Sequence, residues 1–142
     1  MPHHSEKQFS KYSAQQLFEL VADVEKYPEF LPWCRAARIL DRKENEFTAE
    51  LIIAFSHFSE NYVSRVLLTP YSSIEVKLVR GPFEHLTNSW KFTKKDGKTE
   101  IDFWLDFKFR KKILEMLIGS LFAKATAKMV SAFQERADRL YH

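Results

Sequence analysis

The side chains that could perform chemistry are few in this sequence and widely spaced along it. The five histidines show neither the HExxH pattern nor another close metal-ligand spacing, and a single cysteine, Cys34, cannot form a thiolate zinc site. Three glycines are too few for a phosphate-binding loop. Asp102 and Asp106 share the polar face of a predicted strand, where solvated carboxylates are the usual outcome. We therefore expect no enzyme activity, no metal and no cofactor.

A basic run is the clearer chemical signal, and it consists of Lys108, Arg110, Lys111 and Lys112 at the start of the last predicted helix. Positive charge at that end opposes the helix macrodipole, so helix stability does not explain it. Anionic lipid headgroups or RNA phosphates would attract these side chains, whereas a solubilising cluster is the alternative interpretation. The net charge of +3 is small, and we expect no DNA partner.

The composition predicts one globular domain over residues 1–142. A chain of this length with 45% apolar residues can bury a sizeable core without a disulfide. No stretch approaches the ~18 uncharged apolar residues of a membrane-spanning helix. The lone cysteine and the lack of an apolar signal segment predict a cytoplasmic protein.

Hydrophobic spacing predicts the first elements of the fold. Residues 1–12 are predicted to form an edge strand. Ser13 and Gln16 have the spacing of a capping box, which predicts a helix over residues 14–23. The two prolines of residues 28–32 leave room for only a short helical turn between them.

The rest of the chain divides into strands and one helix. Between Arg35 and Arg110 the apolar residues alternate, and turn residues separate six segments that predict antiparallel strands. After Arg110 the apolar steps of three and four predict a terminal helix of about 30 residues along the concave side of the sheet. Gly119 is unfavourable within that helix and suggests that something needs its space. The expected fold is α+β: a curved antiparallel sheet of about seven strands around this helix, in the order β-α-α-β6-α.

A sheet wrapped around a helix leaves a wedge between the two, which is the natural ligand site. Each inward residue taken alone is more often ordinary core than ligand contact. Asn88 stands out because an inward amide must find a partner, either a neighbouring backbone group or a polar atom of a ligand. The predicted cavity lining comprises Leu51, Ile53, Phe55, Leu86, Asn88, Trp90, Phe103, Leu105, Phe107, Leu114, Ile118, Leu121, Phe122 and Met129.

One segment resembles a known family. Residues 17–34 read LFELVADVEKYPEFLPWC, which is similar to the signature of the coenzyme Q-binding START-domain family, also grouped with polyketide cyclase-like proteins. The resemblance implies a helix-grip fold around a hydrophobic cavity. It also implies ubiquinone or a similar isoprenoid lipid as ligand, and a supporting role in respiratory electron transfer or quinone biosynthesis rather than catalysis. Further matching positions are Ser64, Arg65, Val66, Gly81, Pro82, Phe83, Leu86, Trp90, Phe133, Arg136 and Ala137.

The same resemblance leaves other functions open. Some bacterial members are ribosome association toxins that block subunit joining, and this role would depend on Lys111 and Lys112 contacting RNA. A cyclase-type enzyme would need a polar pair inside the cavity, for which Asn88 is the one candidate. A lipid carrier would have an entrance facing a membrane or partner at Phe30, Leu31 and Trp33, with the basic run nearby. We expect such a carrier to lie on the cytoplasmic side of a bacterial inner membrane, peripheral to it.

Overall fold

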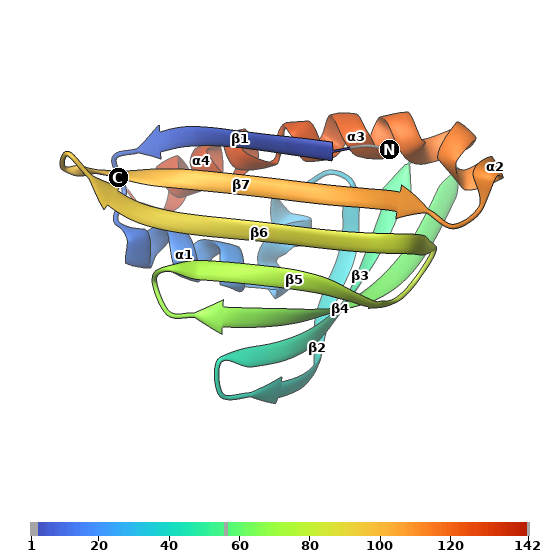
Figure 1. Cartoon of the computed structure of the whole chain (residues 1–142), viewed down its shortest axis with the longest axis horizontal. Coiled ribbons are helices and arrows are strands. Elements are labelled where there is room, and N and C mark those ends of the chain that lie inside the picture. Colours follow the sequence, from blue (N-terminus) through green and yellow to red (C-terminus); the bar gives the residue numbers. More distant parts are fainter. Residues whose placement is uncertain (1–2, 56, 142) are drawn as a thin grey trace.

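The structure is a computed structural model that describes residues 3–55 and 57–141. It contains a seven-stranded antiparallel sheet in the order β1-β7-β6-β5-β4-β3-β2, with helices packed against one face (Figure 1). The edge strand and the six further strands are confirmed, as is the α+β class. The strands are β1 (His3–Ser10), β2 (Cys34–Lys43), β3 (Glu46–Phe55), β4 (Phe58–Thr69), β5 (Ser73–Arg80), β6 (Phe83–Lys95) and β7 (Lys98–Phe109).

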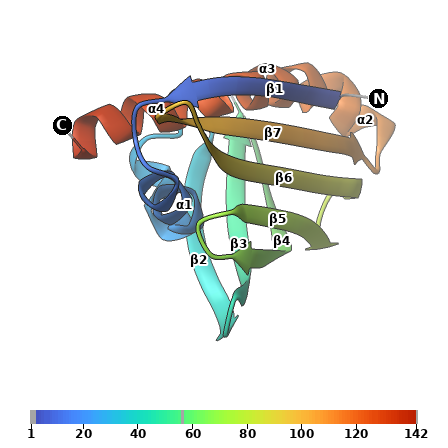
Figure 2. The ribbon, with the colours of Figure 1, turned by 60° about the vertical axis from the view of Figure 1, so that its left-hand side comes forward.

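The sheet is strongly curved. Register shifts occur twice in β2, between Cys34 and Ala36 and between Ile39 and Asp41. Others lie in β5, where Val79 is the extra residue opposite Val63 and Ser64, and in β6 between Phe83 and His85. Such bulges bend a strand and increase its twist. Figure 2 shows the result, because β2 and β3 run steeply away from the direction of β6 and β7. The curvature creates the concave side that the helices fill.

The first helices connect β1 to β2. Helix α1 (Ala14–Ala22) begins with the predicted capping box: the Gln16 amide donates to Ser13 Oγ at 3.1 Å, and the Ser13 amide donates to Gln16 Oε1 at 3.0 Å. The 3-10 helix η1 (Val24–Glu29) follows. It lies earlier than the predicted turn, because Val24 and Tyr27, three residues apart, are both buried and fix the turn before the second proline.

The C-terminal segment is not the single regular helix that the sequence predicted. It comprises α2 (Lys112–Leu114), a π-helical turn η2 (Glu115–Gly119), α3 (Ser120–Ala127) and α4 (Met129–Leu140). Buried Thr126 donates its hydroxyl to the carbonyl oxygens of Phe122 and Ala123, and Lys128 leaves helical geometry at φ −100° and ψ 5°. Side-chain bonds of this kind bend helices. The predicted position along the concave side of the sheet is confirmed (Figure 1).

The core lies between the sheet and this helical segment. Phe122 meets Phe107 edge to face with ring centroids 4.7 Å apart, and Phe133 meets Trp90 at 5.0 Å and Tyr27 at 5.2 Å. Edge-to-face aromatic pairs stabilise a core beyond their buried area. The buried helical positions that form this face are Ile118, Phe122, Thr126, Val130, Phe133 and Ala137.

The space beside Gly119 belongs to a neighbouring side chain. A Cβ atom at Gly119 would lie 2.8 Å from Oε2 of Glu115. That oxygen is buried and has no hydrogen-bond partner among the described residues. The predicted need for space is therefore met by the chain's own carboxylate. In the described part of the chain, no helix is long and apolar enough to cross a membrane.

Candidate functional site: a surface groove above an internal cavity

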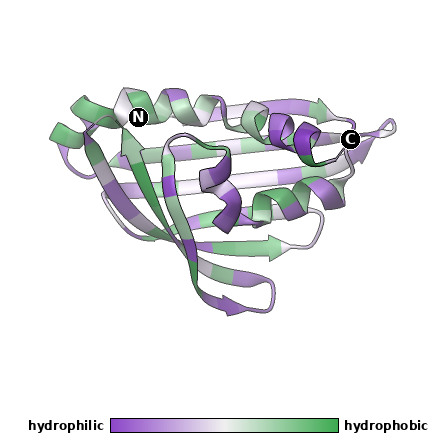
Figure 3. Cartoon of the chain, turned by 180° about the vertical axis from the view of Figure 1, so that it is seen from behind, coloured by the Kyte–Doolittle hydropathy of each residue, from purple (hydrophilic) through white to green (hydrophobic). Residues whose placement is uncertain are grey.

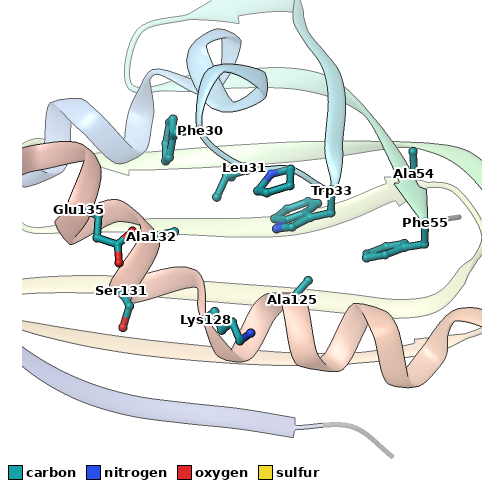
Figure 4. A pocket seen from close by; sticks show the side chains of 11 residues that line it. Phe30, Leu31, Trp33, Ala54, Phe55, Ala125, Lys128, Ser131, Ala132 and Glu135 are labelled. Atoms are coloured by element: carbon teal, nitrogen blue, oxygen red, sulfur yellow. The ribbon is translucent and has the colours of Figure 1, made fainter. Parts of the chain in front are cut away.

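A groove of about 580 Å³ opens where the loop before β2, the end of β3 and the junction of α3 with α4 meet (Figure 4). Its walls are aromatic and aliphatic on the loop and strand side, and carry Lys128, Ser131 and Glu135 on the helix side. The volume lies within the range of small-molecule sites, about 300–1,000 Å³. The complete lining is Phe30, Leu31, Pro32, Trp33, Ala54, Phe55, Ala125, Lys128, Ser131, Ala132 and Glu135.

The loop wall of the groove is held in place from both sides. The Leu31 amide donates to the Tyr27 carbonyl oxygen at 2.9 Å, and the Ala54 amide of β3 donates to the Trp33 carbonyl oxygen at 2.9 Å. Phe30 packs edge to face on Phe133 with centroids 5.0 Å apart. These contacts position the aromatic loop because they join it to η1, to the sheet and to α4.

A second, internal cavity of about 50 Å³ lies below the groove. Trp33 lines both spaces, so its side chain is a wall that they share. A cavity of this volume admits a few ordered waters and no larger guest as it stands. Its lining is Val21, Val24, Tyr27, Trp33, Ala49, Leu51, Tyr62, Ser64, Val66, Ile74, Val76, Asn88, Trp90 and Met129.

The amide of Asn88 is occupied by protein partners. Its Nδ2 donates to the Trp104 carbonyl oxygen at 2.8 Å, and its Oδ1 accepts from Trp90 Nε1 at 3.1 Å. The amide was expected to bond either to a neighbouring protein group or to a ligand, and these contacts are with neighbouring protein groups. The pair also satisfies the indole N–H of Trp90, which is only 2% exposed.

Two other polar groups in the cavity have no hydrogen-bond partner among the described residues. The hydroxyls of Tyr62 and Ser64, two positions apart on β4, both line the cavity, and neither makes a hydrogen bond within residues 3–55 and 57–141. Burial raises the pKa of Tyr62, so its hydroxyl stays protonated at neutral pH and can donate. Gly81 backs this tyrosine closely, since a Cβ atom there would lie 2.5 Å from Tyr62 Cβ. Gly81 has φ +155°, a conformation that side chains rarely adopt.

Cys34 follows Trp33 in the chain and is the first residue of β2. It is 3% exposed, and burial raises the pKa of its thiol to about 11. A thiol of that pKa is almost entirely protonated at neutral pH and is a poor nucleophile. Its interpretation as a buried structural thiol fits this environment. The described residues also contain no cluster of three His, Cys, Asp or Glu side chains that could hold a metal ion.

The structure divides the predicted cavity lining into several groups. Phe55 lines the groove, and Leu51, Asn88, Trp90 and Met129 line the internal cavity. The buried positions that line neither space are Ile53, Leu86, Phe103, Leu105, Phe107, Ile118 and Phe122.

Two predicted lining residues on the helical segment lie elsewhere. Leu121 is 40% exposed, because the inward face is taken by Ile118 and Phe122 on either side of it. Leu114 borders a surface recess beside Arg110 and not the cavity. Their assignment to the lining is therefore wrong, since the predicted helical phase did not include the π-helical turn that precedes α3.

The predicted entrance residues are likewise separated. Phe30, Leu31 and Trp33 line the groove, whereas Arg110 and Lys111 border the recess formed with the start of β4 and the turn before β6. Neither the groove nor the internal cavity nor this recess contains both sets. Lys108 points to Glu84 with Nζ and Oε2 3.2 Å apart, and Lys112 is exposed on α2. The basic run therefore does not rim the groove.

Sequence reasoning missed the residues that give the site its shape and polarity. Tyr62 and Ser64 alternate with Val63 along β4, and this period of two could have identified them as an inward polar pair. Lys128 and Ala132 could not have been found, because the interruption between α3 and α4 has no proline or glycine to mark it.

The comparisons with known proteins agree with this geometry. Residues 10–134 match the family described as polyketide cyclase / dehydrase and lipid transport. The ribosome association toxin RatA of Rickettsia prowazekii is 43% identical over 133 residues, covering 91% of each chain. The mitochondrial coenzyme Q-binding protein COQ10 homolog B of Xenopus laevis is 30% identical over 143 residues, covering 97% of this chain and 59% of the relative.

A solved structure supports the fold. The START superfamily protein from Mycobacterium smegmatis has a TM-score of 0.79 and 18% identity, with 97% of this chain and 98% of that chain covered. At this identity the likeness concerns the fold, which is the helix-grip arrangement of a curved sheet around C-terminal helices. The chain therefore belongs to the polyketide cyclase / dehydrase and lipid transport family and has its START-like fold.

Proposed function

We propose that this protein binds an apolar small molecule with a polar head, of the ubiquinone type, and carries it without catalysis. The observation that supports this most directly is that Trp33 forms a wall both of an open apolar groove and of an internal cavity with two hydroxyls that have no partner among the described residues. The name of the coenzyme Q-binding relative adds support from sequence. In this proposal the isoprenoid tail occupies the groove, and the ring reaches the cavity when Trp33 turns aside.

The binding energy in this arrangement comes from the groove. Burial of apolar ligand surface contributes about 25 cal/mol per Å² before the costs of association are subtracted. The hydroxyls of Tyr62 and Ser64 donate hydrogen bonds to ring carbonyl oxygens, which accept them. Donors without protein partners gain these bonds without losing existing ones. A carrier of this kind would support respiratory electron transfer or quinone biosynthesis.

A cyclase-type reaction is less well supported. Proton abstraction needs a base whose pKa lies near the working pH. Burial raises the pKa of Tyr62 and of Tyr27, which suits hydrogen-bond donation and opposes a role as base. The charged groove residues Lys128 and Glu135 lie on the outer, helical wall and away from the two hydroxyls.

A pair of substitutions tests the groove. Ala132 lines it and is half-buried, so Ala132→Trp should fill it, whereas Ala127 is exposed and lines neither space. Each protein is purified from a quinone-producing bacterial host, extracted with organic solvent and analysed by mass spectrometry. We expect a stoichiometric quinone in the wild type and in Ala127→Trp, and none in Ala132→Trp. Equal retention in both variants, or a clean extract from the wild type, would contradict the proposal.

The polar end of the site is tested separately. Tyr62→Phe removes one hydroxyl and preserves the ring that packs against Phe83 at 5.4 Å. Titration with a short-tailed ubiquinone, followed by quenching of tryptophan fluorescence, should show about fivefold weaker binding, as expected for one lost hydrogen bond. An unchanged dissociation constant would place the ring outside the internal cavity.

Ribosome association is a second candidate, which rests on the 43% identity to a protein named as a ribosome association toxin. Under this function the basic run would contact RNA phosphates and block subunit joining. The test is sedimentation of the protein with ribosomal subunits on sucrose gradients at low and high salt. Salt-sensitive co-sedimentation that Lys111→Gln with Lys112→Gln abolishes, with no quinone in the extract, would favour this function over the carrier.

A further inference from the structure

The first turns of the C-terminal segment expose more aliphatic surface than the fold uses. We name this surface the aliphatic patch: it comprises Ile113 (62% exposed), Met116 (82%), Leu117 (45%) and Leu121 (40%). Isolated exposed apolar residues are ordinary, but these four lie within nine consecutive residues. Figure 3 shows the end of the helical segment away from the C-terminus coloured as hydrophobic.

The opposite side of the same turns is also apolar. Ile118 and Phe122 are buried against the sheet, so the segment is hydrophobic on two faces. A helix with one apolar face has used it once it packs on its own core. Packing of the core therefore does not account for the apolar side chains on the second, exposed face.

The charges around the aliphatic patch are positive. Lys111 and Lys112 precede it and Lys124 follows it, all three exposed, and none forms an ion pair in the described part of the chain. The acidic residue within the patch, Glu115, turns inward beside Gly119, where its Oε2 is buried. Lys108 is the basic neighbour already paired, with Glu84.

We propose that the aliphatic patch and its flanking lysines bind the surface of an anionic lipid bilayer. Aliphatic side chains that insert below the headgroups, flanked by lysines at headgroup level, are the combination that holds a helix in a membrane interface. RNA is the poorer partner, since phosphates attract the lysines but bases stack on aromatic side chains, and the patch is wholly aliphatic.

The aliphatic patch lies on the same helical segment as one wall of the groove, so membrane binding through the patch would bring the groove close to the lipid. Leu121 lies in the first turn of α3, Lys124 follows it one turn later, and Lys128, which directly follows α3, lines the groove. From Leu121 to Lys128 the rise is about 10 Å along the helix axis. A protein docked through the patch would hold the groove near the bilayer surface, where a lipid ligand is collected. The docking itself does not require a ligand in the groove.

Vesicle co-sedimentation tests the proposal. The probes are vesicles of phosphatidylcholine alone and vesicles in which phosphatidylglycerol replaces part of it. Met116→Asp with Leu117→Asp removes exposed side chains from the patch, and Leu140→Asp is the matched control, because Leu140 is 48% exposed at the far end of the same helical segment. Circular dichroism verifies folding of each variant.

We expect the wild type and Leu140→Asp to bind anionic vesicles equally, and the double aspartate variant to bind at least tenfold more weakly. Lys111→Gln with Lys112→Gln should weaken binding roughly 25-fold, at about fivefold per lysine near an anionic surface. Absence of wild-type binding, or equal binding by the double aspartate variant, would overturn the proposal. So would concentration-dependent dimers or ribosome binding that the aspartates abolish while vesicle binding is absent.

We expect different variants to lose vesicle binding and quinone binding, so the two proposals can be tested independently. Ala132→Trp should lose quinone and retain vesicle binding, whereas Met116→Asp with Leu117→Asp should retain quinone and lose vesicle binding. Loss of both in each variant would contradict the assignment of docking and ligand binding to separate surfaces.

Discussion

The two halves of the C-terminal helical segment use their apolar residues differently. In α4 the apolar side chains Val130, Phe133 and Ala137 are at most 1% exposed, and Leu140 at its last position is its one exposed large apolar side chain. In the half from α2 to α3, the buried Ile118 and Phe122 are opposed by the exposed aliphatic patch. The α4 half therefore exposes one large apolar side chain, at its end, whereas the other half exposes four close together, an excess that points to a partner.

The largest predicted effect is the loss of stability when a buried apolar side chain of α4 is truncated, compared with an exposed one in the other half. Phe133 is 1% exposed and meets Trp90, Tyr27 and Phe30, so Phe133→Ala should leave a cavity and lower the free energy of unfolding by about 3–5 kcal/mol. Urea denaturation followed by circular dichroism measures the change.

The matched substitution lies in the other half. Met116 is 82% exposed and makes little use of the core, so Met116→Ala should change the free energy of unfolding by less than about 0.5 kcal/mol. A loss of several kcal/mol at Met116 would show that the aliphatic patch is part of the fold, and the contrast between the two halves would disappear.

A smaller effect is expected at the polar pair beneath α4. Asn88→Ala removes the oxygen that accepts a hydrogen bond from the indole N–H of Trp90, a residue that is 2% exposed. Unpaired buried polar groups of this kind cost about 1–3 kcal/mol, and urea denaturation should show a loss of this size. Neutral behaviour would indicate that water replaces the amide, and Asn88 would then be available to a ligand.

The fold was readable from the sequence because its patterns are local. The alternation of apolar residues in 101–109 and the capping box at Ser13 and Gln16 depend on neighbours within a few positions, and both are confirmed. The shift of η1 and the interruptions of the last helix were not readable. They arise from burial of Tyr27 and Thr126 against distant parts of the chain, which spacing alone does not record.

The candidate site was predicted only in outline. Phe30, Leu31 and Trp33 were placed at an opening, and the structure puts them on the groove. The internal polar groups were assigned to Asn88, whereas Tyr62 and Ser64 hold the unpartnered hydroxyls. Residue type could not distinguish them, because whether a buried polar group is free depends on where its neighbours donate and accept.

A smaller change in stability is expected for Gly119→Ala, at the end of the π-helical turn. Alanine is about 1 kcal/mol more favourable than glycine within a helix, and the new Cβ atom of Gly119→Ala would meet only the flexible carboxylate of Glu115. We expect the free energy of unfolding to rise by up to about 1 kcal/mol as that carboxylate moves into solvent. A decrease of similar size, measured by urea denaturation, would show that the buried position of Glu115 is itself required.

The smallest predicted effect concerns pH and again distinguishes the halves. Glu29 Oε1 accepts a hydrogen bond from Arg136 Nη2 of α4 at 2.6 Å, and this contact lowers the pKa of Glu29. A carboxyl group whose pKa is lowered by folding stabilises the folded state above its unfolded pKa, and this contribution disappears as the pH falls through the folded value. Urea denaturation should therefore show Glu29→Gln slightly less stable than the wild type at pH 7, with the difference shrinking at acidic pH. Lys111 forms no ion pair within the described residues, so the stability of Lys111→Gln should depend on pH as that of the wild type does. If Lys111→Gln were also less stable than the wild type at pH 7 and not at acidic pH, Lys111 would have a carboxylate partner in solution.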